Sequence, residues 1–104
     1  MLSKITLVLL LIMVSPVFGN QHNKIDTLGV SKLGQFVALE EYGYKPNTHS
    51  YFVTIRILNV WTKKYVGSTV EVEEPAHQPV SLEQAREKAK KMASENLKKF
   101  NILG

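Results

Sequence analysis

The segment Tyr51–Trp61 restricts the fold of this chain more than any other. It reads YFVTIRILNVW and is rich in β-branched and aromatic residues, which is typical of a strand. Neighbouring side chains of a strand point to opposite faces, so the segment has two distinct sides. One side is uniformly apolar and consists of Tyr51, Val53, Ile55 and Ile57. We expect this side to face a core and the mixed side, with Phe52, Thr54, Arg56, Leu58 and Val60, to be partly covered or partly wet.

A segment near the C-terminus offers the cover that this apolar side needs. Ser81-Leu-Glu-Gln84 matches a capping box, in which the Ser81 oxygen accepts from the Gln84 amide and the Gln84 side chain returns the bond. The residues after it predict an amphipathic helix, because apolar side chains recur three or four positions apart. The apolar stripe is Leu82, Ala85, Ala89, Met92, Ala93, Leu97 and Phe100. Its middle is small, so the helix can lie close to a sheet.

Three further strands are predicted, over residues 25–30, 35–42 and 65–73, the last alternating cleanly. Residues 31–34 predict a turn, in which Gly34 takes a positive φ. Residues 43–50 contain Gly, Pro and Asn and predict a loop. The expected fold is α+β: a three- to four-stranded antiparallel meander with one C-terminal amphipathic helix packed on one face.

The first 19 residues predict a signal peptide. Lys4 precedes an apolar core at Ile5–Val14, and Val17 and Gly19 suit the −3 and −1 positions of a cleavage site. Ten apolar residues are too few to cross a bilayer, which takes about 20. We expect cleavage after Gly19, a loose segment at 20–24 and a single domain over 25–104. The protein is therefore expected to be periplasmic or secreted, with no transmembrane span after cleavage.

The cysteine content limits the expected covalent links, and the charge distribution limits the expected partners. The chain has no cysteine, so no disulfide forms and no lipid anchor is expected after the cleavage site. Residues 20–80 have six basic and six acidic side chains, whereas 81–104 have six basic and three acidic ones. This mild excess favours contact with acidic surfaces but does not call for nucleic acid, and we expect none to bind.

The pair Glu40 and Glu41 is the first catalytic candidate. Adjacent strand residues point to opposite faces, so the two carboxylates cannot act together across one bond. We interpret one as solvated and the other as capping or pairing locally, with Glu40, on the side of Phe36 and Ala38, accepting from amides of loop 43–50. His22, His49 and His77 lie in separate polar segments without ligand spacing, so no metal site is expected. The chain also has no phosphate-binding Gly-rich loop and no nucleophile elbow, so neither a cofactor nor a catalytic residue is expected.

Three segments resemble those of known groups of proteins. Gly29–Gly43, GVSKLGQFVALEEYG, resembles the opening of a blade in TolB-type β-propellers. It is closer to a group of bacterial secreted proteins of unknown function that carry this TolB/WD40-like blade motif with a Glu-Glu-Tyr-Gly ending. Residues 57–67 resemble the next hairpin of that group and 85–102 its basic, alanine-rich helix. The resemblance implies an exported protein and a rough fold, and it implies no catalytic residues.

The leading hypothesis is a small exported, non-enzymatic protein-interaction domain of the bacterial envelope, which binds through the mixed strand face and loop 43–50. The basic run 86–91 is interpreted as a solvated helix face; the alternative is a contact with acidic protein, lipopolysaccharide or anionic lipid. Two alternatives stay open: an inhibitor or modulator of an envelope enzyme that inserts loop 43–50, and an enzyme with an unrecognised site near Glu40, Tyr42 and His49. The candidate partner contacts are Phe52, Trp61, Tyr65, Tyr44, Arg86 and Lys90.

Overall fold

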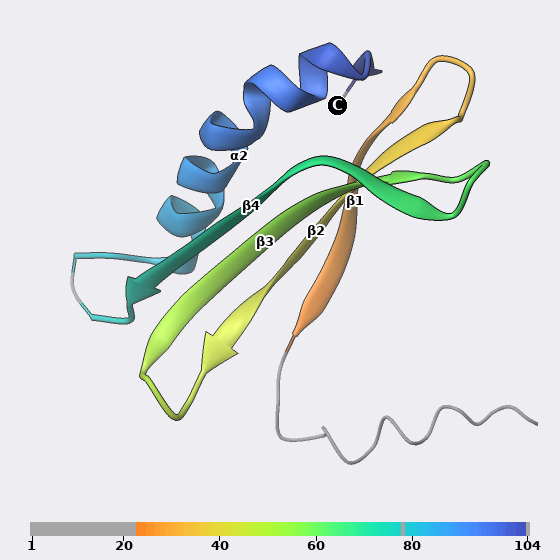
Figure 1. The fold of residues 1–104 in the computed structure, drawn as a ribbon. Helices are drawn as coiled ribbons and strands as arrows, with labels where there is room; N and C mark the ends of the chain where they lie inside the picture. The colour runs from red at the N-terminus through yellow and green to blue at the C-terminus, as the bar shows by residue number, and fades with distance from the viewer. Residues whose placement is uncertain (1–22, 78, 104) are drawn as a thin grey trace, which may run out of the picture.

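The computed structural model describes residues 23–77 and 79–103. The predicted signal peptide and His22 lie outside these residues. Figure 1 shows one sheet with a single helix across it. In chain order the elements are β1 (Lys24–Ser31), β2 (Phe36–Lys45), β3 (Ser50–Asn59), β4 (Lys64–Pro75), α2 (Leu82–Lys99) and β5 (Ile102–Leu103).

The sheet has the strand order β4-β3-β2-β1-β5, and every neighbouring pair is antiparallel. β1 to β4 form a meander, and α2 packs mainly on β3 and β4. The predicted α+β fold is therefore confirmed. β5 was not predicted; it is two residues long and pairs only with Val30 and Ser31 at the end of β1.

The predicted loop 43–50 is too long. Gly43 pairs with Phe52 and Lys45 with Ser50, so the strands continue until Pro46, which has no amide proton for a ladder. Only residues 46–49 form the turn, which closes through the positive φ of His49, 52°. The predicted loose segment at 20–24 is likewise wrong at its end, because β1 already begins at Lys24.

The predicted third strand ends two residues too late. β3 stops at Asn59, whose side-chain oxygen accepts from the amides of Trp61 and Thr62. Asn side chains commonly hold a turn in this way, because they replace the backbone acceptor. Trp61 therefore lies in the β3–β4 turn. The predicted turn at 31–34 is confirmed, since Gly34 has a φ of 78°.

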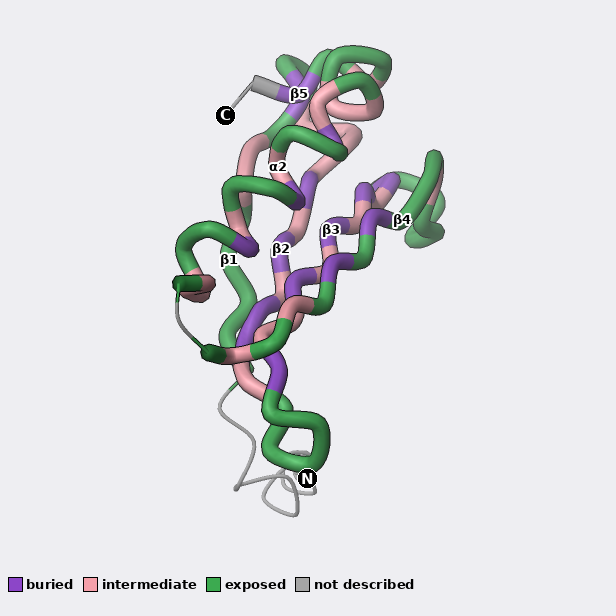
Figure 2. Tube along the Cα trace, turned by 90° about the vertical axis from the view of Figure 1, so that its left-hand side faces the viewer, coloured by how far each residue is buried: buried purple, intermediate pink, exposed green. Residues whose placement is uncertain are grey.

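The core lies between α2 and the side of β3 that was predicted to face it. Val53, Ile55 and Ile57 are buried there. From α2 the three small residues Ala85, Ala89 and Ala93 are buried, so the helix backbone approaches the sheet closely. Figure 2 shows buried positions alternating along the central strands and recurring on one side of α2. Met92 was assigned to the apolar stripe, but it is exposed at the margin of this contact.

The end of α2 is held to the sheet by a second apolar cluster. Ala38, Ile57 and Ile102 are buried in it, and the rings of Phe36 and Phe100 lie 4.9 Å apart beside them. Ile102 belongs to β5, so the short final strand pins the chain after the helix. The cluster brings the C-terminal end of α2 next to the β1–β2 turn.

Gly67 lies where β4 departs from regular pairing. Ile55 pairs with Val70 but Ile57 pairs with Val66, so β4 bulges opposite Arg56. Gly67 has a φ of 73°, and a Cβ there would lie 2.9 Å from Phe100 Cε2. The bulge thus needs glycine both for its backbone angle and for the close approach of α2.

We expect Gly67→Ala to lower the free energy of unfolding by about 1 to 3 kcal/mol, measured by urea denaturation. Gly34→Ala is the matched control, because Gly34 has a similar φ of 78° and nothing within 4 Å of the added methyl group. The larger loss at Gly67 would report the contact with Phe100. Equal losses in the two variants would show that this contact has no weight.

Candidate binding surface

Glu40 is completely buried, with 0 % of its surface exposed, beneath the first turns of α2. Its two oxygens accept hydrogen bonds from Nε and Nη2 of Arg86, at 2.8 and 2.9 Å. The expected contact between Glu40 and loop amides is therefore wrong. Glu40 projects from the face of the sheet that α2 covers, so its partner comes from the helix, 46 residues further along the chain.

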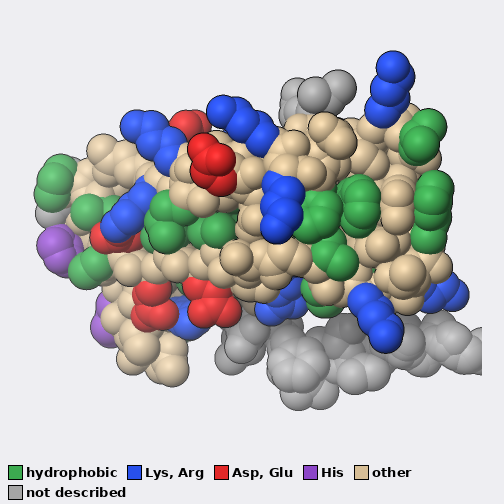
Figure 3. Space-filling model, turned by 45° about the horizontal axis from the view of Figure 1, so that its top comes forward, with side chains coloured by type: hydrophobic (Ala, Val, Ile, Leu, Met, Phe, Trp, Pro, Cys, Tyr) green, Lys and Arg blue, Asp and Glu red, His purple; other side chains and the backbone are tan. Residues whose placement is uncertain are grey.

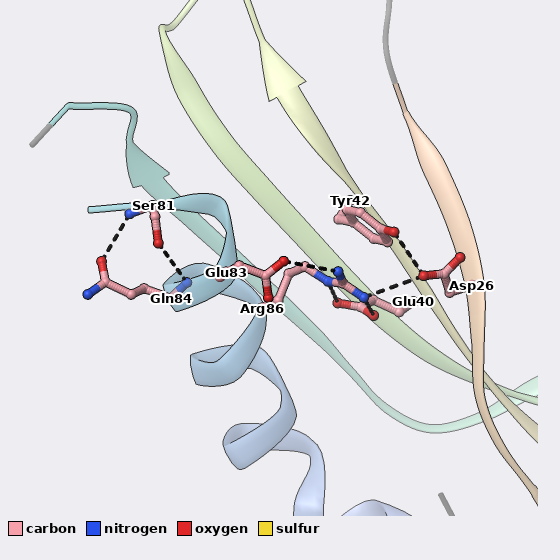
Figure 4. Close-up of polar contacts among 7 residues, drawn as sticks. All are labelled: Asp26, Glu40, Tyr42, Ser81, Glu83, Gln84 and Arg86. Carbon is pink, nitrogen blue, oxygen red and sulfur yellow. Dashed lines mark hydrogen bonds and ion pairs between the residues drawn. The ribbon is translucent and has the colours of Figure 1, made fainter. Parts of the chain in front are cut away.

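Arg86 joins α2 to two strands of the sheet (Figure 4). Its guanidinium also lies 3.9 Å from the centre of the Tyr42 ring and 3.4 Å from Oδ2 of Asp26. The Glu40 carboxylate, which accepts two of its hydrogen bonds, raises the pKa of Arg86 further above the ordinary arginine value. The interpretation of 86–91 as a solvated face is thus wrong for Arg86, whose side chain is only 18 % exposed.

The cluster of Asp26, Glu40, Tyr42 and Arg86 is internally satisfied. The Tyr42 hydroxyl donates to Asp26 at 2.8 Å, and in the described part of the chain no buried side-chain polar atom lacks a partner. Both oxygens of Glu40 accept from the guanidinium and the side chain is completely buried, so neither oxygen is accessible to a substrate. The arrangement therefore fits a clamp between helix and sheet better than a general base.

His49 does not complete a site with Glu40. Its Nδ1 lies 2.9 Å from the hydroxyl of Tyr44, within the β2–β3 turn region. Tyr44 in turn packs edge-on against Tyr51, its partner on β3. The residues of the third hypothesis are therefore split between the buried cluster and this turn. Among the described residues no three His, Asp or Glu side chains are grouped so that they could hold a metal ion.

The hydrogen bond from Tyr42 to Asp26 raises the pKa of Tyr42, and burial acts in the same direction. The folded state then holds the phenolic proton more tightly than the unfolded chain. The resulting stabilisation is complete below about pH 10 and is lost as the pH rises through the higher pKa of the folded state. We expect the difference in unfolding free energy between wild type and Tyr42→Phe to be constant near neutral pH and to shrink above about pH 10. Urea titrations at several pH values test this, and a difference that stays constant into alkaline solution would contradict it.

The face of the sheet opposite α2 has no covering element among the described residues. The strand register places one residue from each of the first four strands in a single row across this face. All four are apolar: Val30, Val37, Leu58 and Tyr65. We call this set the apolar row. Val37 and Leu58 in its centre are half-buried by their neighbours, whereas Val30 and Tyr65 at its ends are exposed.

A row of mixed polar and apolar residues adjoins the apolar row on one side. The next row along the face contains Thr27, Leu39 and Arg56, and the guanidinium of Arg56 lies 5.4 Å from the centre of the Tyr65 ring. The hollow beside Tyr65 measures about 80 Å³, well below the roughly 300 Å³ of a small-molecule pocket. The face is therefore suited to a flat contact with a macromolecule rather than to enclosing a small ligand.

The structure divides the predicted aromatic patch. Tyr65 lies in the apolar row and Trp61 in the β3–β4 turn, both exposed. Phe52 shares the outer face, but it is six residues from Leu58 along β3, about 20 Å away. It pairs with Glu73 and lies under the ammonium of Lys45. Phe52 therefore does not form one contact surface with the other two.

The remaining predicted contacts lie elsewhere. Tyr44 is half-buried on the α2 side of the sheet, Arg86 is held in the buried cluster, and Lys90 is half-buried on α2. Sequence reasoning missed Val30 and Val37 as surface residues, because each stands in a mostly apolar stretch that reads equally well as core. Among the described residues no helix is both long enough and apolar enough to cross a membrane.

The chain was compared with known proteins at three levels. No protein-family model matches it, and no significant match was found among curated proteins or among solved structures.

Proposed function

We propose that this protein is an exported, non-enzymatic interaction domain that binds a protein of the bacterial envelope through the apolar row of its outer sheet face. The observation that carries the proposal is the composition of that row, in which all four strands contribute an apolar side chain to an uncovered face. An antiparallel sheet packed on one side normally presents polar residues on the other.

The outer face has the layout of a protein-binding surface. The row next to its apolar centre includes the polar side chains of Thr27 and Arg56, in the way that an interface core is bordered by a polar rim. Tyr65 and Arg56 are of the residue types that are enriched among strong contacts in interfaces. Covering Val37 and Leu58 with a partner would remove their remaining apolar surface from water, at about 25 cal/mol per Å².

Export and binding without catalysis rest on other observations. The signal peptide predicted over residues 1–19 supports a periplasmic or secreted protein. The burial of Glu40 against Arg86 and the pairing of His49 with Tyr44 support a role in binding rather than catalysis. The alternative of an inserted inhibitory loop has less support, because the turn at 46–49 is short and is tied to the strands by the Tyr44–His49 contact and by the bond from the Ala76 amide to the His49 carbonyl.

A capture experiment with two lysine variants of β3 tests the proposal. Leu58→Lys puts a charge in the centre of the apolar row, and Thr54→Lys, on the same strand and the same face, is the matched control. Envelope proteins are crosslinked to wild type and to each variant. The envelope protein that both wild type and Thr54→Lys capture is then purified, and its affinity for each form is measured by titration. We expect Leu58→Lys to bind it at least ten times more weakly. Equal affinity of both variants would rule out the apolar row as the binding surface. Export is tested separately, by N-terminal sequencing of the processed protein.

A further inference from the structure

Three segments that are distant in the sequence meet at one end of the molecule. The β1–β2 turn and the β3–β4 turn are joined by a hydrogen bond of 2.7 Å from the Val60 amide to the Gln35 carbonyl. The end of α2 reaches the same place, where the ring of Phe100 contacts that of Phe36. In Figure 1 both turns and the end of α2 lie at the right of the molecule. We call this the basic end and define it by Lys32, Lys63, Lys64, Lys98 and Lys99.

The basic end carries a net positive charge, whereas the other described segments together carry a net negative charge. All five lysines are exposed, and none of them forms an ion pair within the described part of the chain. The segments that build this end, residues 30–36, 57–68 and 96–103, contain no Asp or Glu. The other described segments hold seven basic and nine acidic side chains. On the face shown in Figure 3 the acidic side chains lie in the left half, and the right end shows only basic and hydrophobic ones among the coloured types.

Apolar side chains protrude among these lysines. Leu33 at the tip of the β1–β2 turn is 79 % exposed, and Trp61 in the β3–β4 turn is 63 % exposed. Val60 beside Trp61 is exposed as well. Because these residues lie on turns beyond the strand ends, no neighbouring strand can cover them. The exposed apolar side chains of Leu33 and Trp61 are therefore surrounded by lysines that form no ion pair among the described residues.

We propose that the basic end binds the surface of an anionic phospholipid bilayer. Each lysine near such a surface contributes about 1 kcal/mol of electrostatic attraction, within a Debye length of about 10 Å. Tryptophan favours the boundary between headgroups and acyl chains, where its ring is buried and its N–H stays hydrated. Leu33 and Trp61 then enter the bilayer boundary while the lysines contact the headgroups. Acidic groups alone would pair with the lysines, whereas an anionic bilayer also offers an apolar layer to Leu33 and Trp61.

This contact is separate from the proposed protein contact. The basic end is formed by turns and by the end of α2, whereas the apolar row lies across the outer face of the strands. Binding at the basic end would leave Val37 and Leu58 free for a protein partner. The protein would thereby be held at a membrane surface by its two turns and the end of α2.

Trp61 is the only tryptophan of the chain, so its fluorescence reports on this end alone. The full chain is expressed, and all forms are compared in the same processed state so that any contribution of the leader is common to them. Vesicles of equal parts phosphatidylglycerol and phosphatidylcholine are expected to shift the Trp61 emission to shorter wavelength. Vesicles of phosphatidylcholine alone are expected to cause little shift, and high salt should reverse the shift seen with the anionic vesicles.

Two lysine pairs provide matched variants. The double substitution Lys63→Gln and Lys64→Gln is expected to lower the affinity for the anionic vesicles, measured by cosedimentation, about 30-fold, which corresponds to about 2 kcal/mol. Lys90→Gln and Lys91→Gln change the charge of α2 by the same amount away from the turns and should alter binding less than about threefold. Leu33→Ser and Trp61→Ala should also weaken cosedimentation, and circular dichroism confirms that each variant is folded.

Three results would overturn the proposal. Neutral and anionic vesicles could be bound equally well, or the two lysine pairs could have equal effects. Wild type could also ignore anionic vesicles and instead bind immobilised polyglutamate, which would assign the basic end to an acidic protein. The capture experiment on Leu58 and Thr54 is independent of these outcomes, because neither residue belongs to the basic end.

Discussion

Replacing Arg86 by alanine is expected to lower the free energy of unfolding by about 3 to 5 kcal/mol. The loss comes chiefly from Glu40, which stays buried without its hydrogen-bonding partner. Arg86 also loses its contacts with the Tyr42 ring and with Asp26. For a domain of this size such a change removes a large share of the total stability, so urea denaturation should show it clearly.

Two further variants give the Arg86 result its meaning. Lys90→Ala removes a basic side chain one turn further along α2 and is expected to change stability by less than about 0.5 kcal/mol. The double variant Glu40→Met with Arg86→Met removes both charges and should recover most of the loss, because no charge is left buried alone. If Arg86→Ala costs no more than Lys90→Ala, the clamp between α2 and the sheet has no energetic weight. If Arg86→Ala does not fold, the double variant still measures the effect by folding.

Replacing Ile55 by alanine is expected to lower the free energy of unfolding by about 2 to 5 kcal/mol. Ile55 is among the largest completely buried side chains, and it faces the alanines of α2. Those alanines have no longer side chain that could move into the space left behind. The cavity should therefore persist, and Ile55→Val should give a smaller loss of about 0.5 to 1.5 kcal/mol.

Leu58→Ala is the matched control on the opposite face of the same strand. Leu58 is half-buried in the apolar row, with no layer above it among the described residues. We expect its truncation to cost about 1 kcal/mol or less, because little packed volume is lost. Similar losses at both positions would mean that the outer face is covered in solution. That result would point to self-association, which sedimentation at several protein concentrations would detect.

The two faces of β3 therefore separate stability from binding. Ile55 is expected to govern folding, whereas Leu58 is expected to govern affinity for a partner with a modest effect on folding. A partner that binds the apolar row would also raise the stability of wild type by mass action, and more than that of Leu58→Lys. Thermal unfolding with and without the purified partner would measure this difference.

Local patterns predicted the strands and the helix. The alternation at Tyr51–Trp61 identified the side of β3 that is buried, and the predicted capping box at Ser81 and Gln84 is present with both of its hydrogen bonds. These features depend on residues within one element, so they can be predicted from the sequence alone. The element ends were less accurate, because the end of β2 depends on pairing with β3 and not on Gly43.

The buried cluster could not be predicted in this way. Glu40 and Glu41 are equivalent by residue type, and Arg86 stands in a basic run that suits a solvated helix face equally well. Which acid is buried depends on the face of β2 that α2 covers, and which base reaches it depends on the rotation of α2 about its own axis. Both are consequences of packing between segments 46 residues apart.

The arrangement of charge shows the same division. Along the chain Lys32, Lys63–Lys64 and Lys98–Lys99 are three short basic stretches, and most of the net charge falls on the C-terminal segment. Side-chain alternation, capping and turn residues are short-range properties, so the order of residues was sufficient for the strands, the helix and the apolar side of β3. The lysines form one basic end only because the meander places the β1–β2 and β3–β4 turns at the same end of the sheet and α2 ends there. Such distances are set by how the elements pack, and so the candidate surfaces became visible only in the folded chain.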